Sequence, residues 1–298
     1  MDMPKYVRSA ALFSVLAGGC YVFPAAAEIN DCTNITSVPA VITSQGVYCF
    51  KQHLPTSLSS GNAISVNVNN VTIDCNEFKL GNLAAGPANT AIGINANGRL
   101  NVTVRNCGVR GFRTGVSLTN GDYRVEDNKF DHNTQTAILV SGDGSAIRRN
   151  EVVDTGGSTV PGADQFQAIN GLGDVDVIDN TVSGVVATTG SNGDTYGILT
   201  QDMDAGTIKG NRVRNLAKDG TGVRRAIWNE GGNRVTVENN TVVIDAALIV
   251  GEAGIRCGDG LLLNGASRDN TVLGTGVVLQ ALGLINCSPA GGDFVNPL

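Results

Sequence analysis

The sequence predicts an all-β fold: a single-stranded right-handed parallel β-helix of about 8–10 coils. Three observations lead to this prediction, namely a motif that recurs at regular intervals, a turn-rich composition and the lack of helical periodicity. The chain has 298 residues, of which 39 are glycine and 5% are aromatic. Such a composition favours short strands joined by turns over long amphipathic helices.

The recurring motif consists of an apolar residue, two polar residues, asparagine, any residue and a second apolar residue. Successive motif positions are 21 to 31 residues apart, and cysteine replaces asparagine in one copy. Repetition at this period indicates a solenoid in which each repeat forms one coil. Asparagine tolerates the left-handed backbone of a sharp bend, and its amide can pair with the next coil. We therefore expect one file along the axis, formed by Asn76, Cys107, Asn128, Asn150, Asn180, Asn211, Asn240 and Asn270.

A second strand follows the asparagine strand in most coils, and its side chains alternate between the core and the outside. The predicted inward positions are Val116, Ile138, Ile169, Ile198, Ile227 and Ile255. The outward column beside them is Ser117, Leu139, Asn170, Leu199, Trp228 and Arg256.

An export signal is expected at the N-terminus. Lys5 and Arg8 precede an apolar stretch at 11–23 that is too short to span a bilayer, and Pro24 then leads into the small residues Ala25–Ala27. We expect a Sec-type signal peptide, cleavage near Ala27 and a secreted or periplasmic protein, with lipoprotein processing at Cys20 as the alternative. The expected organisation is a signal peptide (1–27), an N-terminal capping segment (28–60) and the β-helix (61–298).

Charge and composition limit the partners that we expect. The formal net charge is −6 and the sequence contains no basic run, which argues against nucleic acid. No segment after the export signal is apolar enough to form a transmembrane segment. The two histidines, His53 and His132, lie far apart, so we expect no cofactor. Asp202 and Asp204 are conceivable calcium ligands or paired acids, but a polar turn is the favoured interpretation of these two residues.

Six cysteines follow the export signal, an even number that indicates disulfides in an exported chain. Cys257 and Cys287 are 30 residues apart, which is one coil. Cys75 and Cys107 are 32 residues apart, also one coil but offset by one column, so their bonding stays open at this point. The expected pairs are Cys32–Cys49, Cys75–Cys107 and Cys257–Cys287.

Aligning the repeats also predicts ion pairs between coils. One outward column contains Asp74, Arg105, Glu126, Arg148, Ile178, Lys209, Glu238 and Arg268, and the signs alternate wherever two charges are neighbours. Parallel strands lie about 4.8 Å apart, so these charges are within ion-pair distance. We interpret them as a ladder that sets the register, with a catalytic role for Arg148 or Arg149 as the alternative.

The stretches NVTIDCNEF (70–78) and NVTVRNCGV (101–109) resemble the large parallel β-helix repeat group, which includes the pectin-lyase-like enzymes. The resemblance covers roughly residues 60–285 and implies the fold. It transfers no catalytic residue, because the sequence lacks the paired aspartates and Gly-His-Gly segment of polygalacturonase-like hydrolases. The signature segments of pectate lyases are absent too.

A candidate site lies beside the longest insertions. The later coils contain extra loops at about 154–167, 184–196, 215–225 and 243–253, and equivalent positions on successive coils place these loops on one flank. Trp228 is the only tryptophan of the chain and points outward next to them. An exposed indole among amides and charges is suited to bind a sugar ring. The alternative is that a loop covers Trp228 and buries it.

The predicted substrate-binding residues are Trp228, Arg256, Gln201, Asn170 and Tyr196. Glu230 and Arg225 are the predicted catalytic pair, a base beside a cation that stabilises a carboxylate during β-elimination. We therefore expect an exported protein that binds an extracellular polysaccharide. If the protein is an enzyme, we expect it to cleave that polysaccharide as a lyase or glycoside hydrolase. The alternative is a non-catalytic envelope or surface scaffold, or an adhesin-like interaction protein with a cell-surface partner.

Overall fold

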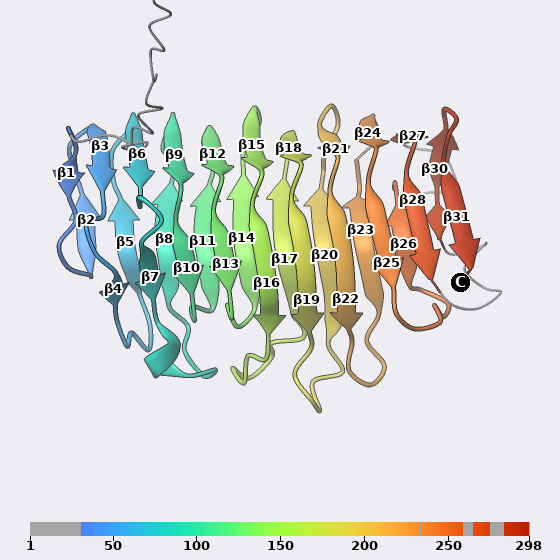
Figure 1. Cartoon of the computed structure of the whole chain (residues 1–298), viewed down its shortest axis with the longest axis horizontal. Helices are drawn as coiled ribbons and strands as arrows, with labels where there is room; N and C mark the ends of the chain where they lie inside the picture. The colour runs from blue at the N-terminus through green and yellow to red at the C-terminus, as the bar shows by residue number, and fades with distance from the viewer. Residues whose placement is uncertain (1–30, 233, 259–264, 275–282, 298) are drawn as a thin grey trace, which may run out of the picture.

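Three parallel sheets run along the whole length of the molecule, and their strands stack side by side from β1 at one end to β31 at the other (Figure 1). The computed structural model describes residues 31–232, 234–258, 265–274 and 283–297. The expected signal peptide (1–27) and Cys20 lie outside the described residues.

Sheet A contains the strands that lead into the asparagine bends. Its order is β1 (Thr33–Asn34), β3 (Gly46–Cys49), β6 (Val71–Asp74), β9 (Val102–Arg105), β12 (Tyr123–Glu126), β15 (Ser145–Arg148), β18 (Val175–Ile178), β21 (Thr207–Lys209), β24 (Val235–Glu238), β27 (Gly265–Arg268) and β30 (Cys287–Pro289).

Sheet C contains the strands that follow these bends. Its order is β4 (Leu54–Pro55), β7 (Lys79–Gly81), β10 (Gly108–Arg110), β13 (Lys129–Asp131), β16 (Glu151–Gly156), β19 (Thr181–Val186), β22 (Arg212–Ala217), β25 (Thr241–Ile244), β28 (Thr271–Gly274) and β31 (Phe294–Pro297).

Sheet B completes each coil. Its order is β2 (Ala40–Ile42), β5 (Asn62–Val66), β8 (Ile92–Asn97), β11 (Thr114–Thr119), β14 (Thr136–Ser141), β17 (Gln165–Leu172), β20 (Asp194–Gln201), β23 (Arg224–Glu230), β26 (Ala253–Arg256) and β29 (Leu284–Ile285). A short 3₁₀ helix, η1 (Leu83–Ala85), lies between β7 and β8.

The predicted fold class is confirmed: each coil passes once through sheets A, C and B, and all strand pairs are parallel. Sheets B and C each have ten strands among the described residues, at the upper end of the expected 8–10 coils. The strands between residues 33 and 55, within the expected capping segment, pair with these same three sheets.

The core is one continuous apolar column inside the coils. The expected inward residues face one another in register, for example Ile198 beside Ile169 and Ile227, and these three side chains are fully buried. Burying each such side chain contributes about 1.5–3 kcal/mol. Since the strands of each coil pair only with those of adjacent coils, stacking is what closes this core.

The asparagine file is confirmed from Asn128 to Asn270. The Oδ1 atom of Asn150 accepts hydrogen bonds from Asn128 N (3.1 Å) and Asn128 Nδ2 (2.9 Å), while Asn150 Nδ2 donates to Val125 O (2.9 Å). The same pattern repeats through the file, and Asp293 Oδ1 ends it by accepting from Asn270. These buried amides therefore satisfy backbone groups as well as one another.

The position of the left-handed bend differs from our expectation. We expected the asparagines themselves to have positive φ, but the residue before each of them does, as at Asp127 (58°), Arg149 (55°) and Asp179 (55°). The reason is geometric: the amide has to point inward to reach the buried carbonyls, so the chain turns one residue earlier.

Asn76 lies outside the file, which corrects one of the eight expected positions. Asn76 and Glu77 both have positive φ, and Asn76 Nδ2 donates to Phe50 O (3.0 Å) rather than to a neighbouring asparagine. Cys75 is buried instead and bonds to Cys107. The shifted bend thus accounts for the one-column offset between these two cysteines.

All three expected disulfides are present. The Cα–Cα distances are 5.8 Å for Cys32–Cys49, 4.7 Å for Cys75–Cys107 and 4.9 Å for Cys257–Cys287. All lie within the usual range for disulfides, and the last two join adjacent coils.

The charge ladder is confirmed as well. Register pairs follow the expected order, and ion pairs join Arg105 to Asp74 (2.8 Å), Arg148 to Glu126 (2.6 Å) and Lys209 to Glu238 (2.6 Å). The Arg148 and Arg149 guanidiniums are both engaged in such pairs. This engagement supports the structural interpretation of these two residues.

Candidate functional site

The outer face of sheet B has the predicted outward column. Cα register pairs connect Ser117, Leu139, Asn170, Leu199, Trp228 and Arg256 from strand to strand. A flanking column contains Tyr196 and Arg225, which are also neighbours in register. The opposite flank brings Gln201 beside Glu230. We call the outward residues of β17, β20, β23 and β26 the Trp228 face.

Trp228 is directed away from the core but is nearly covered. Its relative exposure is 8%, and it forms a small apolar cluster with Tyr196 and Leu199. The Tyr196 and Trp228 rings stack with centroids 5.6 Å apart. The side chains that cover the indole, Tyr196 and Leu199, thus come from the sheet itself, and the indole is not exposed as an open binding surface.

Two guanidiniums flank the indole. The central carbon of Arg225 lies 4.1 Å from the Trp228 ring centroid, and that of Arg256 lies 5.6 Å from it. Cation–π contacts of this kind contribute about 0.5–2 kcal/mol, depending on desolvation. The outcome is a partly buried aromatic base with two planar cations beside it.

Hydrogen bonds fix the polar groups of this face. Gln201 Nε2 donates to Glu230 Oε2 (2.8 Å), and Asn170 Nδ2 donates to Gln167 Oε1 (2.9 Å). Asn170 Oδ1, in contrast, is a buried acceptor for which the described residues provide no donor. All the predicted substrate-binding residues therefore lie on one face.

Tyr196 is held as a hydrogen-bond donor. Its hydroxyl donates to Asp194 Oδ2 (2.7 Å), and Arg225 Nη1 donates to the same hydroxyl (3.3 Å). Burial above all, and then the hydrogen bond to Asp194, raises the pKa of Tyr196 far above its ordinary value. The phenol is consequently neutral across the physiological range and is not suited to act as a base.

The predicted catalytic pair is less compact than the binding residues. Arg225 and Glu230 lie near the two ends of β23 (Arg224–Glu230), and no ion pair joins them among the described residues. Arg225 Nε instead donates to Gly251 O (3.1 Å), and Glu230 accepts from Gln201. The catalytic role of this pair stays a prediction.

The long loops lie side by side at one edge of the sheets, as expected (Figure 1). Thr188 Oγ1 donates to Ser158 O (2.6 Å), and Asn192 N donates to Asp219 Oδ2 (2.9 Å). Further along, the buried carboxylate of Glu252 accepts from Arg224 Nη2 (2.8 Å). These bonds link loops of successive coils into one wall.

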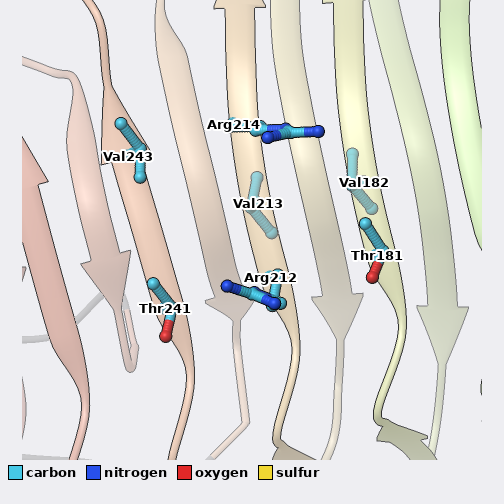
Figure 2. A pocket seen from close by; sticks show the side chains of 7 residues that line it. All are labelled: Thr181, Val182, Arg212, Val213, Arg214, Thr241 and Val243. Atoms are coloured by element: carbon cyan, nitrogen blue, oxygen red, sulfur yellow. The ribbon is translucent and has the colours of Figure 1, made fainter.

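A second candidate region lies on the outer face of sheet C, and our sequence analysis missed it. A hollow of about 200 Å³ is lined by Thr181, Val182, Arg212, Val213, Arg214, Thr241 and Val243, from β19, β22 and β25 (Figure 2). Arg212 and Arg214 are exposed, whereas Val213 between them is buried. The available signal was that neither arginine has an acidic residue at the aligned positions of the neighbouring coils.

Within the described ranges, no group of three or more His, Cys, Asp or Glu side chains is arranged to hold a metal ion. No helix within the same ranges is long and apolar enough to cross a membrane.

Comparisons with known proteins concern the fold. No curated protein matches the sequence. Among solved structures, the enzymatically active domain of bacteriophage CBA120 tailspike protein 2 aligns with 10% identity and a TM-score of 0.38, over 86% of this chain and 42% of that chain. The A-module of mannuronan C-5 epimerase AlgE4 from Azotobacter vinelandii aligns with 10% identity and a TM-score of 0.27, over 86% and 77% respectively.

A family model supplies the assignment. Residues 91–277 match the model described as "Right handed beta helix region", which covers the chain from just before β8 to beyond β28. The match therefore includes the asparagine file, the long loops and both candidate regions. On this evidence, the chain belongs to the right-handed β-helix family.

Proposed function

We propose that this protein is exported and binds an acidic extracellular polysaccharide on the Trp228 face. The observation that supports this proposal is the grouping of two guanidiniums, Arg225 and Arg256, around the ring of Trp228. The nearly covered indole holds these two guanidiniums in place, and planar guanidiniums are suited to bind the carboxylate of a sugar ring.

The rest of the face adds the groups that such a ligand requires. Guanidinium forks match carboxylates in two-point hydrogen bonds, and amides such as those of Gln201 and Asn170 are suited to sugar hydroxyls. Half-buried Glu230 provides an acceptor at the opposite flank. The linked loops at one edge would limit the ligand on that side.

Export is supported by the cysteine chemistry. Three disulfides are typical of proteins that fold in oxidising compartments, which agrees with the expected signal peptide and with a secreted or periplasmic location. Mass spectrometry of the mature N-terminus tests this part. A mature chain that begins with residue 28 is expected. A chain that keeps residues 1–27 would contradict export, and a lipid-modified Cys20 would contradict only the cleavage site near Ala27.

The binding proposal is tested with Arg225→Gln and Arg256→Gln in affinity measurements against polygalacturonate, alginate and neutral dextran. Each substitution removes a charge-assisted hydrogen bond, so we expect about tenfold weaker binding of the acidic polymers and none of dextran by any variant. Arg124→Gln is the matched control, because Arg124 is exposed on the outer face of sheet A. Unchanged affinity in both variants would overturn the proposal.

Cleavage is a separate question from binding. A lyase would use Glu230 as the base and Arg225 to stabilise the carboxylate, leaving an unsaturated product that absorbs ultraviolet light. An absorbance assay on pectate, alginate and glucuronan decides this point. Product formation that Glu230→Gln abolishes would establish a lyase, whereas binding without product would restrict the function to recognition.

One observation favours the non-catalytic scaffold as a second candidate function. With 8% exposure, Trp228 behaves as a buried part of the face rather than as a free ring, and a covered aromatic cluster is also typical of a structural contact. A scaffold predicts binding to a cell-surface partner but to no acidic glycan. The same affinity measurements therefore distinguish the two functions.

A further inference from the structure

Arg212 and Arg214 break the charge pattern of the outer face of sheet C. In the coils of β10, β13 and β16 on this face, cations meet carboxylates across the coils, as in Lys129–Glu151 (3.0 Å) and Arg110–Asp131 (2.8 Å). Within the described residues, neither arginine of β22 forms an ion pair. Two exposed positive charges thus lie two positions apart on one strand without internal compensation.

Hydroxyl groups occupy the places where the ladder would have acids. Arg212 is flanked in register by Thr181 and Thr241. Arg214 is flanked on one side by Ser183, whose Oγ accepts from Arg214 Nε (3.3 Å) and from Asn215 Nδ2 (3.1 Å). These hydroxyls orient the site but leave its positive charge unneutralised.

The hollow between these side chains gives the site a shape. Figure 2 shows Arg212 extending toward the strand of Thr241 and Arg214 extending the opposite way, toward the strand of Val182. Adjacent outward positions on a strand are about 6.6 Å apart, and the hollow has a volume of about 200 Å³. This space is large enough for a small oxyanion or for one charged sugar unit.

We propose that this hollow, the Arg212–Arg214 site, binds an oxyanion: the carboxylate of a uronate or the ester group of a sulfated sugar. The two forks supply charge-assisted donors, and Thr181 and Thr241 supply neutral donors or acceptors beside them. The site lies on sheet C and Trp228 lies on sheet B, so this proposal goes beyond the function proposed above and does not depend on it.

Titration with sodium sulfate, at constant ionic strength set with chloride, tests the anion site by heteronuclear NMR of the arginine side chains and of the backbone amides. In the wild-type protein we expect saturable shifts of two arginine Nε–Hε signals and of the backbone amides of β22. The amide shifts remain measurable in every variant: Arg212→Gln/Arg214→Gln should lose them, and the single variants should each bind about tenfold more weakly. Arg212→Lys/Arg214→Lys keeps the charge but lacks the fork, so weaker binding is expected there too.

The matched control is Arg124→Gln/Arg234→Gln, which removes the same charge from two other exposed arginines. It should bind sulfate as the wild type does, and Trp228→Phe should too. If the control double variant lost sulfate binding to the same extent, the loss would be an effect of net charge alone, and the proposal would be overturned. Retention of saturable shifts in the Arg212→Gln/Arg214→Gln variant would overturn it as well.

The source of the anion is decided with two polymers, polygalacturonate for carboxylates and dextran sulfate for sulfate esters, against neutral dextran. Preference for one acidic polymer that disappears in Arg212→Gln/Arg214→Gln, but persists in Arg225→Gln, would assign that polymer to this site. Loss in Arg225→Gln alone would assign it to the Trp228 face. No binding of either polymer by the wild type would exclude both as ligands.

Discussion

The outer face of sheet C uses its cations differently in the short coils at residues 102–156 and in the longer coils at 181–256. In the short coils, ion pairs join Arg110 and Lys129 to carboxylates of an adjacent coil. In the longer coils, Arg212 has only threonines beside it in register, and Arg214 contacts a serine hydroxyl, although the ladder of sheet A continues through both regions. The interior of the two regions is the same, so the difference is confined to the surface.

This comparison indicates where function is located in a repetitive fold. An outward charge that meets its opposite on the next coil helps to set the register and has little left for a ligand. An outward charge that faces a neutral group keeps its capacity to bind. Among the described residues, the longer coils contain Arg212 and Arg214, which form no ion pair, as well as the linked loops, and both candidate sites lie there.

The largest effects are expected from substitutions in the asparagine file, which both regions share. Asn150→Ala in a short coil and Asn211→Ala in a longer coil each remove a buried amide that donates to a backbone carbonyl and to the next asparagine. Each should lower the free energy of unfolding by about 3 kcal/mol, because several buried groups lose partners together. Chemical denaturation measures both losses.

Asn97→Ala is the control for this pair, since Asn97 is exposed and accepts a single hydrogen bond from Asn120. It should change the free energy of unfolding by no more than about 0.5 kcal/mol. Clearly unequal losses at Asn150 and Asn211 would contradict the idea that loop length leaves the interior unaffected.

The sequence was sufficient for these shared features. The repeat determines which residues are neighbours in register, so the ladder partners of Glu126 and Glu238 and the Cys257–Cys287 disulfide followed from spacing. The spacing left Cys75–Cys107 open because of its offset. The sequence was not sufficient for the bend, which lies before each asparagine. Side-chain alternation reports the direction of a residue, whereas the bend depends on which buried carbonyls the amide can reach.

The two candidate sites show the same limit. Alternation predicted correctly that Trp228 points outward, but its cover depends on how Tyr196, Arg225 and Arg256 fold across the ring. The hollow beside Arg212 depends on side chains from three coils about 30 residues apart. Missing acids at aligned positions were the only sequence signal for it.

An ion pair added on sheet C of the longer coils tests the difference between the two regions directly. Thr241→Glu places a carboxylate in register with Arg212, as Glu151 is with Lys129. We expect an internal ion pair that changes the free energy of unfolding by less than about 1 kcal/mol. Sulfate affinity should fall about tenfold, because the arginine is then neutralised. The NMR titration measures this fall, and Thr271→Glu, one coil further, is the control.

The smallest expected effect concerns a ladder carboxylate. Hydrogen bonds from Lys209 and then Arg268 hold the pKa of Glu238 below its ordinary value of 4.5. A lowered pKa contributes stability that is complete above pH 4.5 and is lost as the pH falls through the folded-state value. The side chains of Lys209 and Arg268 are 46% and 56% exposed, so solvent screening limits this contribution to less than about 1 kcal/mol.

The stability difference between wild type and Glu238→Gln should be constant above pH 5 and shrink below it. A difference that grew on acidification would show that the charged form of Glu238 is not stabilised by its neighbours, and the ladder would then be a geometric pattern without electrostatic effect.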